Sequence, residues 1–164
     1  MSIPTNFDKV RRSRERLPSI SPLTETLSPQ NTTSEEVAEH FKTAIQSKKI
    51  LITGASPKGL GAAFAQAVSR HSPGLLVLAG RTQRALDETK AELLEETPNL
   101  KVQLLNVEFA SLRSVRKAAA EVLAYEENVD VFVANAGVMA TAEGKIEDGT
   151  PCLMTLEGRR QLLT

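Results

Sequence analysis

Apolar positions follow two alternating patterns through the central part of the chain. Short, largely apolar runs occupy 50–52, 75–78, 102–105 and 129–134. Runs rich in aliphatic and β-branched residues are typical of parallel strands that helices cover on both faces. The segments between these runs repeat their apolar residues at helical spacing. The pattern therefore predicts four parallel strands that alternate with helices.

Three helices are predicted between and around these strands, at about 60–71, 83–96 and 111–126. In the second of them, Leu86 and Leu93 are expected to face inward. Strand–helix alternation at this spacing implies right-handed crossover connections. The fold class predicted from the pattern is therefore α/β, a doubly wound parallel sheet.

The segment 1–33 follows neither pattern. It contains four of the eight prolines and no glycine, and its apolar residues share no face. We interpret it as a disordered N-terminal arm. Ordered structure is expected from Ser34, an N-cap that Glu35 and Glu36 follow in the first turn. The apolar face of this first helix is expected to comprise Val37, Phe41, Ala44 and Ile45.

The pattern fades after about residue 140. Residues 141–164 combine glycine, proline and charges of both signs without a convincing strand. We predict three segments: the arm 1–33, a nucleotide-binding half-domain at 34–140, and an irregular C-terminal tail at 141–164.

Composition narrows the class of protein. Twenty Lys and Arg balance 20 Asp and Glu, which argues against nucleic acid as a partner because phosphate binding needs a basic excess. Cys152 is the single cysteine, so the fold does not depend on an internal disulfide. No apolar run approaches the roughly 20 residues of a membrane span, and no signal peptide is apparent. We expect a cytoplasmic protein with no membrane partner.

The glycine-rich segment Thr53–Gly61, TGASPKGLG, follows the first strand and opens a helix. Backbone N–H groups and the helix dipole at such a turn can hold a pyrophosphate. Gly54 would permit the tight turn, Gly59 would let a phosphate approach, and Gly61 would let the helix pack on the strand. A turn without a ligand is the alternative. A P-loop is excluded, because Leu60 and Gly61 stand where that motif needs Lys and Ser or Thr.

The end of the second strand indicates which dinucleotide would bind. NAD sites usually place Asp or Glu there to bind the ribose hydroxyls. This chain has Arg81 instead, with Arg84 close behind and Lys58 in the glycine turn. A guanidinium can bind a 2′-phosphate with two hydrogen bonds, whereas a carboxylate would repel it. The sequence favours NADP over NAD, with an exposed loop cation as the alternative for Arg81.

The turn Thr-Gly…Gly-Leu-Gly after strand one, together with Asn135-Ala136-Gly137 after strand four, resembles the short-chain dehydrogenase/reductase family, and most of all its fungal, retinol-dehydrogenase-like members. The resemblance covers roughly 34–140. It implies a Rossmann-like sheet and NADP-linked hydride transfer to or from a small carbonyl or alcohol substrate. The glycine turn is one residue longer than is usual in the family, and Ala134 replaces the first asparagine of the strand-four motif.

The resemblance assigns cofactor-binding roles to eight residues. Arg81 falls on the position that binds the 2′-phosphate, and Glu108 on the position of an Asp that contacts the adenine ring. Asn135 lies where the family's asparagine steadies the sheet beside the nicotinamide ribose. The residues assigned to the cofactor phosphates are Gly54, Ser56, Gly59, Leu60 and Gly61.

The catalytic Ser, Tyr and Lys of the family have no counterpart in this sequence. The single tyrosine, Tyr125, is followed four residues later by Val129, so the Tyr-x-x-x-Lys motif is absent. His40 and His71 are isolated, and no cluster with metal-ligand spacing is apparent. We therefore predict neither catalytic nor metal-binding residues.

Because only four strands are predicted, we expect a sheet that is truncated relative to the family, with the run 131–133 on an exposed edge. Three hypotheses stay open. The chain is an oxidoreductase by ancestry that lacks its catalytic half, a catalytically inactive nucleotide- or partner-binding remnant, or a product without function. Neither the substrate's identity nor the oligomeric state is predicted.

Overall fold

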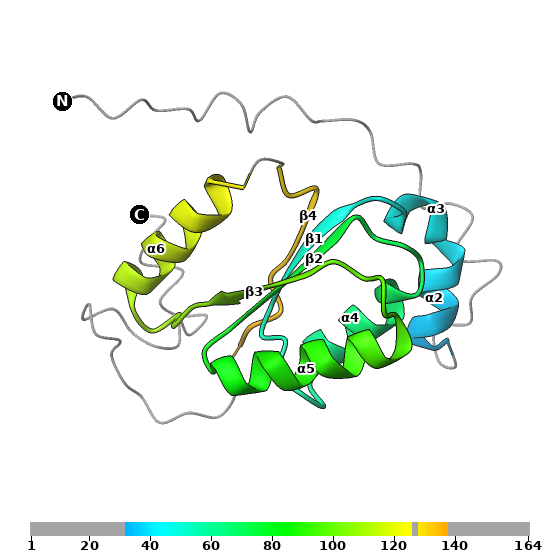
Figure 1. Ribbon diagram of the computed structural model, residues 1–164, viewed down its shortest axis with the longest axis horizontal. Helices are drawn as coiled ribbons and strands as arrows, with labels where there is room; N and C mark the ends of the chain where they lie inside the picture. The colour runs from blue at the N-terminus through cyan, green and yellow to red at the C-terminus, as the bar shows by residue number, and fades with distance from the viewer. Residues whose placement is uncertain (1–31, 126–127, 138–164) are drawn as a thin grey trace, which may run out of the picture. The chain divides into compact units, whose positions relative to one another are not determined.

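A four-stranded parallel sheet in the order β3-β2-β1-β4 forms the centre of the computed structural model, which describes residues 32–125 and 128–137 (Figure 1). The order and the parallel pairing confirm the predicted doubly wound sheet. The predicted tail 141–164 and nearly all of the arm 1–33 lie outside the described residues. The strands are β1 Lys49–Thr53, β2 Leu75–Gly80, β3 Val102–Asn106 and β4 Val131–Val133.

Five helices flank the strands in the described part of the chain. The helix that follows β2 keeps its predicted limits, and the other two predicted helices are a few residues shorter than expected. Within the described residues, no helix is both long and apolar enough to cross a bilayer. The helices are α2 Ser34–His40, α3 Lys42–Ile45, α4 Leu60–Ser69, α5 Gln83–Glu96 and α6 Leu112–Leu123.

The predicted apolar face of the first helix is wrong. The helix is interrupted at Phe41, between α2 and α3, and Val37, Phe41 and Ala44 are exposed. Ile45 is buried as predicted, and Ala38, which is outside the predicted face, is buried in the same core cluster. The small side chain of Ala38 lets α2 lie close against α4, so tertiary packing overrides the apolar spacing that the sequence suggested.

Apolar side chains fill both faces of the sheet, because successive residues of a strand point to opposite sides. Ile52 and Leu78 are register partners and belong to the cluster that α4 and α5 cover. Leu51 and Val77 are also partners and belong to the cluster that α6 covers. The core therefore consists of two layers, one on each side of β1 and β2.

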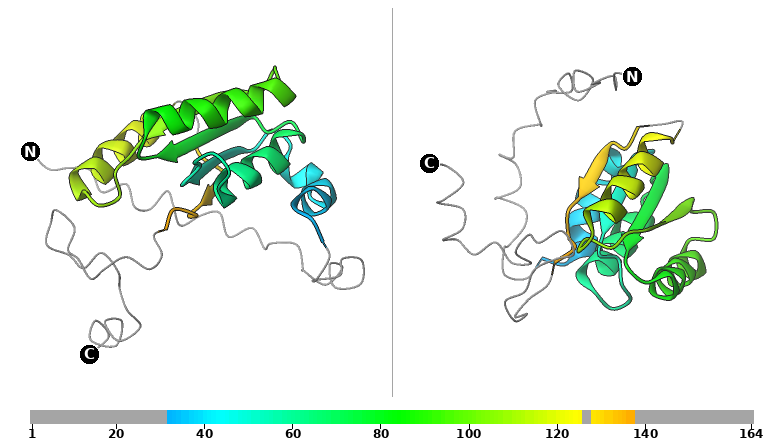
Figure 2. Two further views of the ribbon diagram at one scale, coloured as in Figure 1. Left: turned by 90° about the horizontal axis from the view of Figure 1, so that it is seen from below. Right: turned by 90° about the vertical axis from the view of Figure 1, so that its left-hand side faces the viewer.

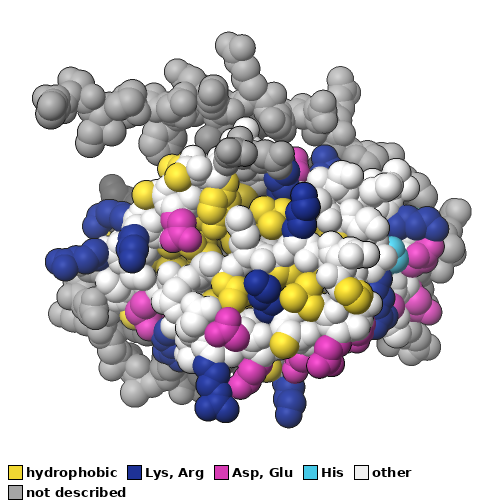
Figure 3. All heavy atoms as spheres, viewed as in Figure 1, with side chains coloured by type: hydrophobic (Ala, Val, Ile, Leu, Met, Phe, Trp, Pro, Cys, Tyr) yellow, Lys and Arg dark blue, Asp and Glu magenta, His cyan; other side chains and the backbone are white. Residues whose placement is uncertain are grey.

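Strand β4 lies at the edge of the sheet, as both views in Figure 2 show. It pairs with β1 over three residues, and Phe132 is 64% exposed and Val131 40% exposed. Within the described residues, the predicted edge position of 131–133 is confirmed, with Val133 partly buried against the core. In Figure 3, Lys and Arg side chains are interspersed with Asp and Glu side chains along the lower edge of the molecule, over α5.

Candidate functional site

The glycine turn between β1 and α4 contains a tight reverse turn. This reverse turn accommodates the one residue by which the segment exceeds the usual length in the family that it resembles. The N–H of Gly59 donates to the carbonyl oxygen of Ser56 at 3.1 Å. Pro57 occupies the second position of this turn, and Lys58 at the third position has φ +60°. Proline followed by a residue with positive φ is the pattern of a type II turn. The turn therefore brings the chain to the start of α4 without lengthening the helix.

Two glycines of the turn lie where a side chain would collide with backbone. Gly54 has φ +71°, and a Cβ there would lie 2.8 Å from the Cα of Ala136. A Cβ on Gly61 would lie 2.6 Å from the carbonyl oxygen of Gly54 and 2.7 Å from Nδ2 of Asn135. All three distances are below contact distance for carbon, so the first turn of α4, the end of β1 and the segment after β4 meet at these glycines.

Asn135 joins the segment after β4 to the end of β1. Its Nδ2 donates to the carbonyl oxygens of Thr53 at 2.9 Å and of Gly54 at 3.2 Å. Its backbone N–H donates to Oγ1 of Thr53 at 3.0 Å, and so does the N–H of Ala136. The Thr53 hydroxyl in turn donates to the carbonyl oxygen of Val133 at 3.2 Å. This network fixes the backbone of the glycine turn against β4.

Two threonines that were not among the predicted site residues support the turn. Thr53 is the hydroxyl centre of the network around Asn135, and it is buried. Thr89 is also buried, and its Oγ1 donates to the carbonyl oxygen of Ala55 at 3.0 Å. A signal for Thr89 was present, since it lies between Leu86 and Leu93 on the inward face of α5. A polar residue at such a position needs a buried partner.

Arg81 and Glu108 meet where β2 and β3 end. Nε of Arg81 lies 3.8 Å from Oε2 of Glu108. The carbonyl oxygen of Arg81 accepts a hydrogen bond from Nδ2 of Asn106 at 3.1 Å, and the N–H of Val107 donates to the carbonyl oxygen of Gly80 at 2.9 Å. The two oppositely charged side chains therefore come from backbones that are held together.

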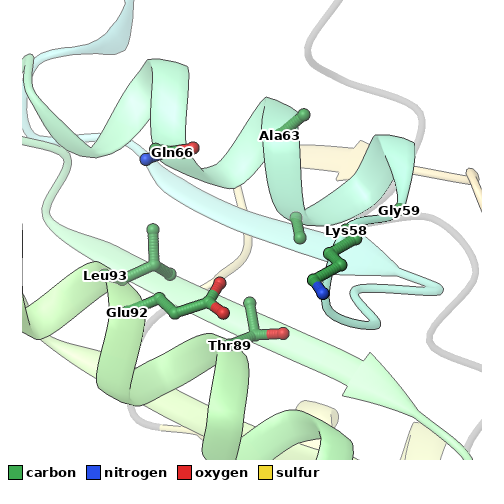
Figure 4. Close-up of a pocket in the computed structure, with 8 residues that line it drawn as sticks. Lys58, Gly59, Ala63, Gln66, Thr89, Glu92 and Leu93 are labelled. Atoms are coloured by element: carbon green, nitrogen blue, oxygen red, sulfur yellow. The ribbon is translucent and has the colours of Figure 1, made fainter.

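A groove of about 220 Å³ lies behind the glycine turn, between α4 and α5. Figure 4 shows the side chain of Lys58 reaching from the turn toward Thr89 at this groove, with the carboxylate of Glu92 nearby. The groove is also lined by Gly59 and Leu93. Lys58 therefore lies on the α5 side of the glycine turn.

The predicted site residues gather at the carboxyl edge of the sheet, which is the side on which all four parallel strands end. Gly54, Ser56, Gly59, Leu60 and Gly61 form the turn after β1, Arg81 and Glu108 follow β2 and β3, and Asn135 follows β4. The side chain of Leu60 is 82% exposed at the first position of α4. Ligands of open α/β sheets bind at this edge.

The arrangement fits an anionic dinucleotide. At Gly54 and Gly61 there is no room for a side chain, so the end of β1 lies close against the start of α4. Ser56 and Leu60 of the same turn are exposed. The N-terminus of a helix attracts phosphate through its unpaired N–H groups and its dipole. Arg81 supplies an exposed cation at the neighbouring strand end. The cofactor-binding roles of the individual residues remain predictions.

Tyr125 lies away from this edge, after the end of α6, and packs against the cluster that α6 covers. Burial raises the pKa of its hydroxyl, and the nearby Glu121 carboxylate raises the pKa further.

Within the described residues, no group of three His, Cys, Asp or Glu side chains is placed to hold a metal ion.

The sequence profile of the short chain dehydrogenase family matches residues 48–151. The chain is 36% identical over 108 residues to the oxidoreductase fscI of Fusarium equiseti, and 34% identical over 108 residues to retinol dehydrogenase 13 of Homo sapiens. Each alignment takes in 66% of this chain, but only 42% and 32%, respectively, of those relatives. The chain thus spans less than half the length of the curated relatives that it matches.

Among solved structures, the fold is similar to L-sorbose reductase from Gluconobacter frateurii in complex with NADPH and L-sorbose. The TM-score is 0.52 at 28% sequence identity, and the match covers 63% of this chain and 38% of the reductase. The residues that the family profile matches include the glycine turn and all four strands of the described sheet.

Proposed function

Because the chain belongs to the short-chain dehydrogenase family, we propose that it is an NADP-linked oxidoreductase that acts on a small carbonyl or alcohol. The observation that carries this proposal is the glycine turn at the carboxyl edge of the sheet, together with Asn135, which we call the cradle. There Gly54, whose carbonyl oxygen accepts a hydrogen bond from Asn135, follows β1 and lies close to Gly61 in the first turn of α4. The NADPH in the L-sorbose reductase structure supports the same cofactor.

Each part of the cradle has a role in holding the cofactor. The backbone at Ser56, Gly59, Leu60 and Gly61 would bind the pyrophosphate at the helix N-terminus. Asn135 would keep the end of β4 beside the nicotinamide ribose, because its amide is fixed by the carbonyl oxygens of β1 and the glycine turn. When bound, the cofactor supplies the hydride that is exchanged with the substrate carbon.

The choice of NADP over NAD rests on Arg81. Its side chain is 74% exposed at the end of β2, where a ribose 2′-phosphate would lie in a dinucleotide site of this class. A guanidinium binds phosphate through two parallel N–H groups. Glu108, the residue that the resemblance places at the adenine ring, lies next to it.

Titration calorimetry with NADPH and NADH tests the proposal on the full chain. NADPH is expected to bind more tightly than NADH, and Arg81→Glu is expected to weaken NADPH binding about tenfold or more by reversing the charge at the 2′-phosphate. Lys101→Glu makes the same charge change at the opposite edge of the sheet, before β3, and should bind as the wild type does. A chain that binds neither nucleotide contradicts the proposal.

A second candidate is a nucleotide-binding protein that does not catalyse hydride transfer. The observation that favours it is Tyr125, the only tyrosine of the sequence. Family catalysis needs a tyrosine that loses a proton readily, whereas the pKa of Tyr125 is raised and its ring packs in the α6 cluster. NADPH binding without NADPH oxidation over a panel of ketones and aldehydes would favour this candidate.

A further inference from the structure

We propose that Glu108 is a specificity-determining residue of the nucleotide site that acts through Arg81. Its carboxylate offsets part of the guanidinium charge and so weakens the preference of the site for a 2′-phosphate. The inference rests on the proposed function, since it concerns the same adenosine end of the site. It gives Glu108 a role different from the adenine contact that the family resemblance implies.

The backbone places the two side chains next to each other. Arg81 directly follows β2 and Glu108 lies two residues beyond β3, and these strands are parallel neighbours. The hydrogen bond from the N–H of Val107 to the carbonyl oxygen of Gly80, at 2.9 Å, holds the strand ends together. Nδ2 of Asn106 holds the carbonyl oxygen of Arg81. The register of the sheet therefore places the two side chains at neighbouring strand ends.

Glu108 is fixed more firmly than Arg81. Its Oε1 accepts a hydrogen bond from the N–H of Ala110 at 3.0 Å, and its own N–H donates to Oγ of Ser114 at 2.9 Å. Its side chain is 40% exposed, whereas that of Arg81 is 74% exposed. The second carboxylate oxygen, Oε2, is thus held facing the guanidinium.

The spacing of the pair leaves Arg81 able to bind a ligand. Nε of Arg81 lies 3.8 Å from Oε2 of Glu108, which is beyond hydrogen-bond distance. The guanidinium can therefore still direct N–H groups to a phosphate. The negative charge of Glu108 would lie close to that phosphate, and two negative charges repel at this range even where solvent screens them. A ribose 2′-hydroxyl carries no charge, so the carboxylate affects it much less.

The test uses two probes that differ only in the 2′-phosphate, adenosine 2′,5′-bisphosphate and adenosine 5′-monophosphate. Their dissociation constants are measured by calorimetry for the full chain and for Glu108→Gln, which keeps an oxygen for the N–H of Ala110. Binding of the bisphosphate is expected to tighten roughly two- to fivefold, the scale of one exposed charge pair. Binding of the monophosphate should change by less than about 1.5-fold.

Two further variants separate charge from shape. Glu108→Asp keeps the charge, so the ratio of the two dissociation constants should stay close to that of the wild type. Glu95→Gln removes the same charge near the far end of α5. Glu95 lies roughly 16 Å along α5 from Arg84, which is in the first turn of this helix, three residues after Arg81. This distance exceeds the screening length of about 8 Å, so Glu95→Gln should leave the ratio unchanged. Thermal unfolding checks that each variant is folded.

The outcomes distinguish this inference from the proposed function. The measured quantity is the dissociation constant of the monophosphate divided by that of the bisphosphate. A rise of this ratio in Glu108→Gln, but not in Glu108→Asp or Glu95→Gln, supports the inference. If the wild type binds both probes and Glu108→Gln leaves the ratio unchanged, or Glu108→Asp raises it equally, the inference is wrong and the proposed function stands. If the wild type binds neither these probes nor NADPH, both are wrong.

Discussion

Gly61 lies where the first turn of α4 is closest to the end of β1. A Cβ at this position would lie 2.6 Å from the carbonyl oxygen of Gly54 and 2.7 Å from Nδ2 of Asn135. The first of these neighbours is backbone, and the second is held by two hydrogen bonds. Neither can move without loss of the network that shapes the turn.

Gly61→Ala is therefore expected to lower the free energy of unfolding by about 1–3 kcal/mol, the usual cost of overpacking. It should do so even though alanine favours a helix by about 1 kcal/mol over glycine. Gly137→Ala is the matched control, because its nearest neighbour would be the carbonyl oxygen of Asn135 at 3.9 Å. Urea unfolding measures both variants. Equal stability of the two would contradict the close approach at Gly61.

At the scale of elements, Glu96 links the two helices that cover one face of the sheet. It stands at the last position of α5, and its carboxylate accepts hydrogen bonds from Arg70, after α4, and from Gln66 in α4. These hydrogen bonds, first that from Arg70 and then that from Gln66, lower the pKa of Glu96 below its ordinary value of 4.5. In the unfolded chain the carboxyl group loses these partners and binds protons more readily.

A lowered pKa in the folded state gives a stability that is present above pH 4.5 and is lost as the pH falls through the folded-state pKa. Glu96→Gln should therefore have a lower Tm than the wild type at pH 7, and the difference should shrink in more acidic solution. Glu95→Gln is the control, since Glu95 is an exposed carboxylate next to Glu96 in the last turn of α5. A Tm difference that does not change between neutral and acidic pH would show that Glu96 acts without its charge.

The sequence predicted some elements better than others for identifiable reasons. Helix α5 has its predicted limits, Gln83–Glu96, because its apolar stripe is regular and Pro98 follows it closely. The first helix was predicted with the wrong face, because its break at Phe41 and the burial of Ala38 depend on contact with α4. Local pattern thus identifies an element, but tertiary packing decides which side it buries.

In the candidate site, too, local features could be predicted from the sequence, whereas contacts between distant residues could not. The glycine turn was recognised from consecutive residues, since positive φ and close approach restrict the choice of amino acid locally. The hydrogen bond between Asn135 and Thr53 joins residues 82 positions apart, and the pair of Arg81 and Glu108 depends on the register of β2 with β3. Arg81 was predicted from its place at the end of the second strand, and Asn135 and Glu108 from the family resemblance, but contacts of this kind follow only from the assembled sheet.

At the scale of the whole molecule, the strands of the sheet differ in how far they are buried and paired. Strand β2 pairs on both sides and its residues Leu76, Val77 and Leu78 are fully buried. Within the described residues, β4 pairs only with β1, over three residues, and it exposes Phe132. Edge strands open at a lower free energy than the centre of a sheet, because fewer buried contacts are lost.

Hydrogen exchange followed by mass spectrometry should therefore show faster exchange in 129–134 than in 75–80, by about tenfold or more. Saturating NADPH should slow exchange in the peptide that contains Asn135, because this residue ties β4 to the glycine turn, where the pyrophosphate would bind. It should leave Leu100 and Lys101, at the opposite edge of the sheet, unchanged apart from any global effect. Equal exchange of β2 and β4 without nucleotide would mean that the whole sheet opens as one unit, and that the exposed edge does not weaken it.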